Sequence, residues 1–254
     1  MNKPYTAGMN AHFPPPTVPL SGLQTALAQS GQACLGAADV AAWAGVSAHD
    51  LSVLQTSWSD LPSDRYLKDG GRYRRRRHSS YRVDGGVAHL VPHRAHWQPV
   101  SYNALHGGME RWFEPVAPGV SSALAWQRLL VTTAAVASGL RGEQPWFLEA
   151  HQFRIDTTDG IGRPTPEGAH RDGVDLVAVF MVGRHQIKGG ESRVFAADGP
   201  QGLRFTLTEP WSLLLLDDTR VIHETTPIQP LSPDGVGWRD TLVLTCRAGG
   251  FQDA

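Results

Sequence analysis

The second half of the chain is a succession of short apolar runs, and this pattern restricts the possible folds more than any other feature of the sequence. Runs of this length are typical of strands, and the glycines and prolines between them are typical of turns. Short strands at such close spacing predict a sandwich or barrel, and we expect a jelly roll, that is, a double-stranded β-helix. The runs are Phe147–Ile155, Asp175–Val182, Ser192–Ala196, Leu203–Leu207, Trp211–Leu216 and Thr241–Cys246.

The first half of the chain contains mostly helical patterns. Apolar residues recur at helical spacing over residues 21–29, 37–44 and 47–58, and over the longer segment 121–140. We therefore expect a mainly β protein with α additions, in which N-terminal and central helices buttress the jelly roll. Residues 1–18 are rich in proline and show little periodicity, so we expect a flexible leader there. A single domain should follow over residues 19–254, with core strands at about 147–247.

The composition argues against several functional classes. The net charge is −1, so no global field attracts nucleic acid or an anionic membrane surface. Two cysteines are too few for a disulfide framework, and no apolar run approaches the roughly 18 residues of a membrane-spanning helix. We expect a cytoplasmic protein with no nucleic-acid partner and no membrane partner. The sequence leaves the oligomeric state open.

A histidine and a carboxylate stand two residues apart in the stretch Pro166-Glu167-Gly168-Ala169-His170-Arg171-Asp172-Gly173. On an extended backbone His170 and Asp172 project to the same side, so they can bind one metal ion. His223 follows the apolar run 211–216 and is the candidate third ligand. Two histidines and one carboxylate leave one side of a metal open, as in the facial triad of non-haem iron(II) oxygenases. His170, Asp172 and His223 are therefore the candidate metal ligands and catalytic residues.

A guanidinium and a hydroxyl accompany the last predicted strand. Arg239 and Thr241 share one strand face by parity, and together they are a candidate clamp for the distal carboxylate of a dicarboxylic cosubstrate. Two alternatives stay open. Arg239 can instead pair with a surface carboxylate such as Asp234 or Asp240, and Arg247, at the far end of the same strand, is a rival anchor.

The most basic stretch of the chain is Arg72-Tyr73-Arg74-Arg75-Arg76-Arg77. On a strand, Arg74 and Arg76 share one face, which makes them candidates for gripping a substrate carboxylate bidentately. The same stretch also fits a phosphate-binding stripe, or an exposed edge strand whose charges prevent pairing with another chain.

Several motifs together resemble one enzyme family. The motifs are Asp64-x-Tyr66, Gly71-x-Tyr73-Arg74-x-Arg76, Gly107-Gly108, Pro166-Glu167-Gly168-x-His170-x-Asp172-Gly173, Gly189-Gly190-Glu191-Ser192 and Asp217-Asp218-x-Arg220-x-x-His223. Between about residues 60 and 247 the chain resembles the bacterial 2-oxoglutarate/iron(II) dioxygenases that include L-isoleucine 4-hydroxylase and N-substituted amino-acid hydroxylases. The separation of His223 and Arg239 is longer than in the wider superfamily, and residues 230–237 read as a loop insertion that accounts for it.

The resemblance implies Fe(II) at His170, Asp172 and His223, with 2-oxoglutarate at Arg239 and O2 as the second cosubstrate. It implies hydroxylation of the side chain of a free or N-substituted L-amino acid, with release of succinate and CO2. One alternative is a nucleic-acid or protein demethylase of the same superfamily, although the net charge disfavours nucleic acid. Another is a non-catalytic, cupin-like protein that binds a metal or ligand, although structural zinc sites are usually closed and rich in cysteine.

Overall fold

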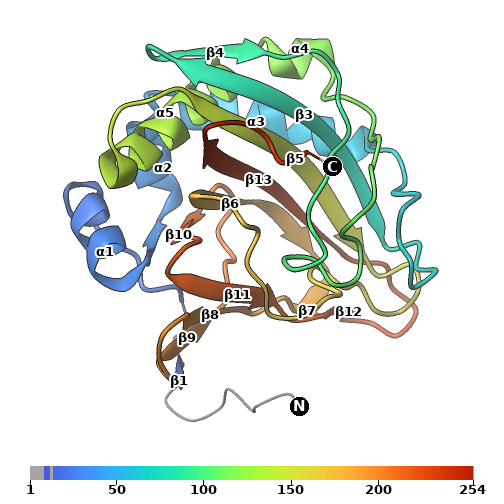
Figure 1. Cartoon of the computed structure of the whole chain (residues 1–254). Helices are drawn as coiled ribbons and strands as arrows, with labels where there is room; N and C mark the ends of the chain where they lie inside the picture. Colours follow the sequence, from blue (N-terminus) through green and yellow to red (C-terminus); the bar gives the residue numbers. More distant parts are fainter. Residues whose placement is uncertain (1–8, 12–13, 254) are drawn as a thin grey trace.

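Two facing β-sheets form the centre of the protein in a computed structural model that describes residues 9–11 and 14–253 (Figure 1). All pairings between the strands of these two sheets are antiparallel except that of β1 with β9. The large sheet has the order β2 (Gln32–Leu35), β10 (Leu213–Asp217), β6 (Leu176–His185), β13 (Trp238–Ala248), β5 (Trp146–Asp156), β3 (Arg74–Asp84) and β4 (Val87–Leu90). The small sheet has the order β1 (Met9–Ala11), β9 (Gly202–Phe205), β8 (Ser192–Ala196) and β11 (Val221–Thr225). β7 (Ile187–Gly189) and β12 (Ile228–Pro230) pair separately.

Helices cover one face of the large sheet, as the sequence predicted (Figure 1). They are α1 (Leu23–Ser30), α2 (Ala37–Ala44), α3 (Ala48–Gln55), α4 (Pro118–Ser121) and α5 (Leu124–Arg141), with 3-10 turns at Leu20–Gly22 and Thr56–Asp60. α5 carries Trp126, Leu129 and Leu130 on the side that meets the sheet, where they join the main core. The prediction of a mainly β jelly roll with helical additions is confirmed.

The other face of the large sheet meets the small sheet. At one end of this interface apolar side chains such as Met181 and Phe205 fill the space as a second core. At the other end the sheets enclose a cavity. Alternation along β13 sorts its side chains between the two faces, because successive residues of a strand point in opposite directions. Leu242 and Leu244 enter the main core, whereas Thr241 and Val243 line the cavity.

Most of the predicted flexible leader lies outside the described residues. Of the remainder, Met9–Ala11 runs parallel to β9, and Thr17 forms an isolated bridge with Cys34. The leader and the domain limits therefore stay predictions. Within the described part of the chain, no helix is both long enough and apolar enough to cross a membrane.

Candidate active site

The cavity between the two sheets has a volume of about 130 Å³ and collects polar residues from distant parts of the chain. Every site residue predicted from the sequence lines it. These residues are Arg74, Arg76, His170, Asp172, His223, Arg239 and Thr241. Arg247, the rival anchor, donates instead to the backbone carbonyls of Gly250 and Phe251 and is absent from the cavity wall.

His170, Asp172 and His223 converge at one end of the cavity, where their ligand atoms lie within 4.8 Å of one another. Nε2 of His170 is 3.8 Å from Oδ1 of Asp172, and Nε2 of His223 is 3.6 Å from Oδ2. The two histidines also exchange both backbone hydrogen bonds, of 3.0 and 2.9 Å, so their side chains leave the backbone on the same face. The loop that carries His170 thus extends the small sheet beside β11.

A buried carboxylate that the sequence analysis did not single out fixes the loop around Asp172. Asp218 is fully buried and accepts hydrogen bonds from the backbone N–H groups of Asp172, Gly173 and Val174, at 2.8–3.1 Å. Gly173 has a φ of 77°, and a Cβ there would come within 2.4 Å of the ring of Tyr102. A glycine is needed at this turn because it has the required φ and leaves space for the ring.

A hydrogen bond at Nδ1 of His170 leaves the lone pair on its Nε2, the nitrogen that faces Asp172. Nδ1 of His170 donates to the carbonyl of Gly168 at 2.9 Å, which leaves Nε2 as the acceptor nitrogen. Burial lowers the pKa of His170, but the carboxylates of Asp172 and Glu167 raise it above its usual value. Burial and the neighbouring His170 lower the pKa of His223 to about 3.

Arg239 is a buried cation without a hydrogen-bond partner at two of its nitrogens. It is 4% exposed, and its Nε and Nη2 make no hydrogen bond with any described residue. Asp240, one of its predicted alternative partners, is held by Arg154 through two bonds of 2.8 and 2.7 Å. Burial and Arg184 lower the pKa of Arg239 to about 10, so it stays charged at neutral pH. Such a guanidinium beside Thr241 fits the carboxylate of a ligand.

Arg74 and Arg76 point inward from β3, as strand parity predicted, but other residues already engage them. Nε of Arg74 donates to the buried Asp64 at 2.6 Å. Arg76 lies between the rings of Phe113 and Phe153 and contacts Nδ1 of His151 at 2.6 Å. Nη2 of Arg74 and Nε of Arg76 have no partner among the described residues.

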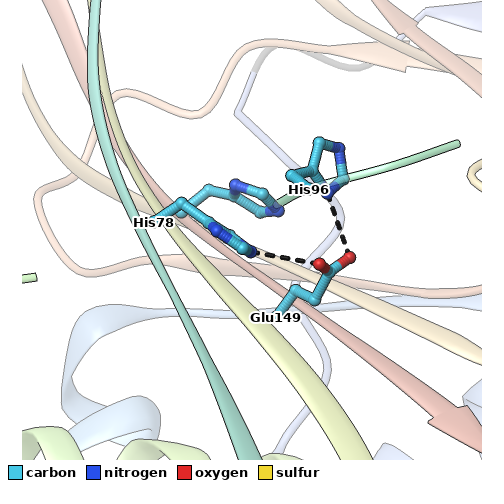
Figure 2. A group of neighbouring side chains, drawn as sticks. His78, His96 and Glu149 are labelled. Carbon is cyan, nitrogen blue, oxygen red and sulfur yellow. Dashed lines mark hydrogen bonds and ion pairs between the residues drawn. The ribbon is translucent and has the colours of Figure 1, made fainter. Parts of the chain in front are cut away.

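A second group of imidazoles surrounds Glu149 on β5 (Figure 2). Nε2 of His78 and Nδ1 of His96 each lie 3.1 Å from one of its carboxylate oxygens, and His151 completes the group. Burial raises the pKa of Glu149, but His96 and His78 lower it well below its usual range. The ionised carboxylate can only accept, so both imidazoles must donate to it. No sequence motif connects these four residues, which come from three separate segments.

The pattern of the 2OG-Fe dioxygenase family matches residues 55–245, a segment that contains all the predicted site residues. The chain belongs to this family. A bsmA homolog from Methylobium petroleophilum PM1 is 49% identical, with a TM-score of 0.89 over 95% of this chain and 98% of that one. No curated protein matches the sequence.

More distant structures share the fold alone. IDO from Bacillus thuringiensis has a TM-score of 0.73 at 15% identity, over 93% of this chain and 97% of that one. The Fe(II)/α-ketoglutarate-dependent dioxygenase TqaL has a TM-score of 0.70 at 21% identity, over 92% and 90% of the respective chains.

Members of the 2OG-Fe dioxygenase family use Fe(II), 2-oxoglutarate and O2, so the predicted cofactors are confirmed, and the protein is a non-haem iron oxygenase. The donor set of His170, Asp172 and His223 fits the metal, because two imidazoles and one carboxylate suit iron with one side left open. The unpartnered guanidinium of Arg239 in the same cavity fits the distal carboxylate of 2-oxoglutarate.

Proposed function

We propose that this dioxygenase hydroxylates the side chain of a free or N-substituted L-amino acid. One O2 and one 2-oxoglutarate would be consumed for each C–H bond converted to C–OH, and succinate and CO2 would be released. The proposal depends chiefly on one observation. A single cavity contains the convergent His170, Asp172 and His223, the unpartnered Arg239, and an end that is rich in arginine.

In this proposal the residues of the cavity divide into four roles. His170, Asp172 and His223 hold Fe(II), which together with 2-oxoglutarate supplies the oxidising chemistry when bound. Arg239 and Thr241 bind and orient the distal carboxylate of 2-oxoglutarate. Arg74 and Arg76 belong to the end that receives the carboxylate of the substrate. Val179 and Val243 give the cavity an apolar part that helps to exclude water.

The placement of the basic stretch supports a small substrate over a nucleic acid. Arg74 and Arg76 are buried. The outward-facing arginines already have partners: Arg72 pairs with Asp159, Arg75 with Asp156 and Arg77 with Glu114. A strand whose arginines are buried or paired lacks the broad exposed basic surface that nucleic-acid binding requires.

Anaerobic addition of Fe(II) and 2-oxoglutarate tests the site, and a substrate panel then tests the function. We expect the charge-transfer absorption of the iron–2-oxoglutarate chelate, followed under O2 by succinate formation that depends on an L-amino acid or its N-acyl derivative. The His223→Ala variant should lose both signals. Absence of the band in the wild type would contradict the assigned metal site. A normal band without amino-acid-dependent succinate would contradict the substrate class alone.

A further inference from the structure

A two-stranded bridge in the loop between β4 and α4 presents polar side chains to the cavity. His96 and Arg111 exchange both backbone hydrogen bonds, of 2.9 and 3.0 Å, so their side chains project from the same face. Gln98 lies two residues from His96 and lines the cavity with both of them. Neither His96 nor Arg111 was among the site residues predicted from the sequence.

Gln98 connects this bridge to the candidate metal site. Its Nε2 donates to Oδ1 of Asp172 at 3.3 Å, and its Oε1 accepts from Nη2 of Arg111 at 2.9 Å. One neutral side chain therefore separates the guanidinium of Arg111 from a candidate iron ligand. A molecule bound at Arg111 would place its remaining atoms beside the metal site.

Arg111 carries a buried charge that forms no direct ion pair with a described residue. Its side chain is 2% exposed, its Nε has no hydrogen-bond partner, and it forms no ion pair with any described residue. Asp64 pairs directly with other arginines, at 2.6 Å from Nε of Arg74 and 3.8 Å from Nη1 of Arg76. Burial and Arg74 lower the pKa of Arg111, whereas the carboxylates of Asp64, Glu167 and Glu149 raise it from a distance. The resulting pKa of about 10 keeps it protonated at neutral pH. A buried cation of this kind is costly unless an anion joins it.

His96 offers a hydrogen-bond acceptor beside that cation. Its Nδ1 must carry the proton, because it faces the ionised Glu149, which can only accept (Figure 2). Its Nε2 therefore carries the lone pair of the neutral ring. Burial lowers the pKa of His96 to about 4, so the ring is neutral at pH 7. A neutral imidazole accepts a hydrogen from an ammonium or amide N–H without repelling it.

We propose that His96 and Arg111 form the subsite for the head group of the substrate. The guanidinium of Arg111 binds the carboxylate, and Nε2 of His96 accepts a hydrogen from the adjacent nitrogen. This inference rests on the proposed function and sharpens it, because the substrate must carry both an anionic carboxylate and an N–H group beside it. A carboxylic ester lacks the first group, and a desamino acid lacks the second.

Ligand analogues combined with variants test the two contacts separately. The wild type would first be assayed for succinate formation with the twenty common L-amino acids and their N-acetyl derivatives. The most active compound, its methyl ester and its desamino analogue would then be titrated into protein loaded with Mn(II) and 2-oxoglutarate. For each variant, the affinity for the most active compound is divided by the affinity for its methyl ester and by the affinity for its desamino analogue. A misfolded fraction binds none of these ligands, so it does not change the two ratios.

Arg111→Gln should weaken binding of the acid about 10- to 100-fold, because a charge-assisted hydrogen bond is lost, and should change binding of the ester less than about 3-fold. Arg77→Gln is the matched control. It removes an arginine that pairs with Glu114 outside the cavity, and all ratios should be unchanged.

His96→Asn keeps an N–H that reaches Glu149 but removes the acceptor at the position of Nε2. It should reduce the preference for the amino acid over its desamino analogue about 10-fold. His96→Gln, whose amide oxygen reaches further, should restore part of that preference.

Two outcomes would overturn the inference while the proposed function stands. In the first, Arg111→Gln weakens the acid and the ester equally, or weakens neither. In the second, the preference for the amino acid is unchanged in His96→Asn. If no amino acid drives succinate formation in the wild type, the proposed function and this subsite both fail.

Discussion

Two groups of imidazoles, one around Asp172 and one around Glu149, lie in or beside the same cavity, and the charges that surround them differ. In each group the ligand atoms lie within 4.8 Å of one another. Two further carboxylates lie beside the Asp172 group: Glu167 is 3.7 Å from His170, and Asp218 holds the loop. Two cations lie beside the Glu149 group: Arg94 is 3.4 Å from Oε1 of Glu149, and Arg76 contacts His151. Residue type alone therefore does not define a cation site.

The two groups also differ in where their histidines donate hydrogen bonds. At the Asp172 group, His170 donates its proton outward to the carbonyl of Gly168, so a lone pair faces the centre. At the Glu149 group, His78 and His96 donate inward to the carboxylate. A metal there would have to displace those protons and face Arg76 and Arg94. We infer that the Asp172 group, called the iron group below, binds iron. The Glu149 group is a hydrogen-bonded support for the cavity wall.

The largest expected effect is on metal stoichiometry. The wild type should bind one Fe(II) per chain, measured by metal analysis after anaerobic loading. His223→Ala should raise the metal Kd by more than about 100-fold, because losing a ligand exceeds the 10- to 100-fold cost of losing an outer contact. His78→Gln, a change in the other group, should still bind one equivalent. Two equivalents in the wild type, with one lost in His78→Gln, would show that both groups bind metal.

The next effect concerns the unpartnered guanidinium that shares the cavity with the iron group. Arg239→Gln should raise the KM for 2-oxoglutarate about 10- to 100-fold, because the charged partner of its distal carboxylate is lost. Arg247→Gln is the control, since Arg247 lies outside the cavity wall and donates to the backbone carbonyls of Gly250 and Phe251. Equal effects of the two changes on KM would argue against Arg239 as the anchor.

A smaller effect should follow from loosening the support of the iron group. Asp218→Asn replaces one accepting oxygen with a donor, so at least one of the three backbone N–H groups loses its partner. We expect a metal Kd about 10-fold higher and a free energy of unfolding lower by about 1–3 kcal/mol. Isothermal titration with Mn(II) and urea denaturation measure the two quantities. The exposed Asp234→Asn should change neither, and an unaltered Kd in Asp218→Asn would show that the loop holds its shape without this carboxylate.

The smallest effect is a pH dependence that belongs to the Glu149 group. Burial lowers the pKa of His96 to about 4, whereas a histidine of the unfolded chain titrates near 6.5. Between these values the unfolded chain binds more protons, so the free energy of unfolding should fall as the pH drops, by at most about 1.4 kcal/mol per pH unit for this histidine. Urea denaturation at pH 7, 6 and 5 measures the slope. It should be shallower in His96→Asn, and equal slopes would mean that His96 does not contribute.

Much of the iron group could be predicted from the sequence because its geometry is mostly local. His170 and Asp172 are two residues apart, and Arg239 and Thr241 share a strand face by parity. Asp218 was harder to recognise, although it directly follows β10, because its function appears only when the loop 172–174 folds against it. Arg111 was missed because nothing near it in the sequence shows that its charge stays unpaired.

The sequence by itself determined the jelly roll and which neighbouring residues of a strand share a face, such as His170 with Asp172 and Arg239 with Thr241, because strand periodicity fixes the direction of each side chain. Only the tertiary structure decided which buried charges are already paired. Arg74 is bound to Asp64, whereas Arg111 and Arg239 form no ion pair with a described residue and each has side-chain nitrogens without a hydrogen-bond partner. The physical reason is that the side a residue faces follows from its immediate neighbours, whereas the pairing of a buried charge depends on groups that long-range strand pairing brings beside it.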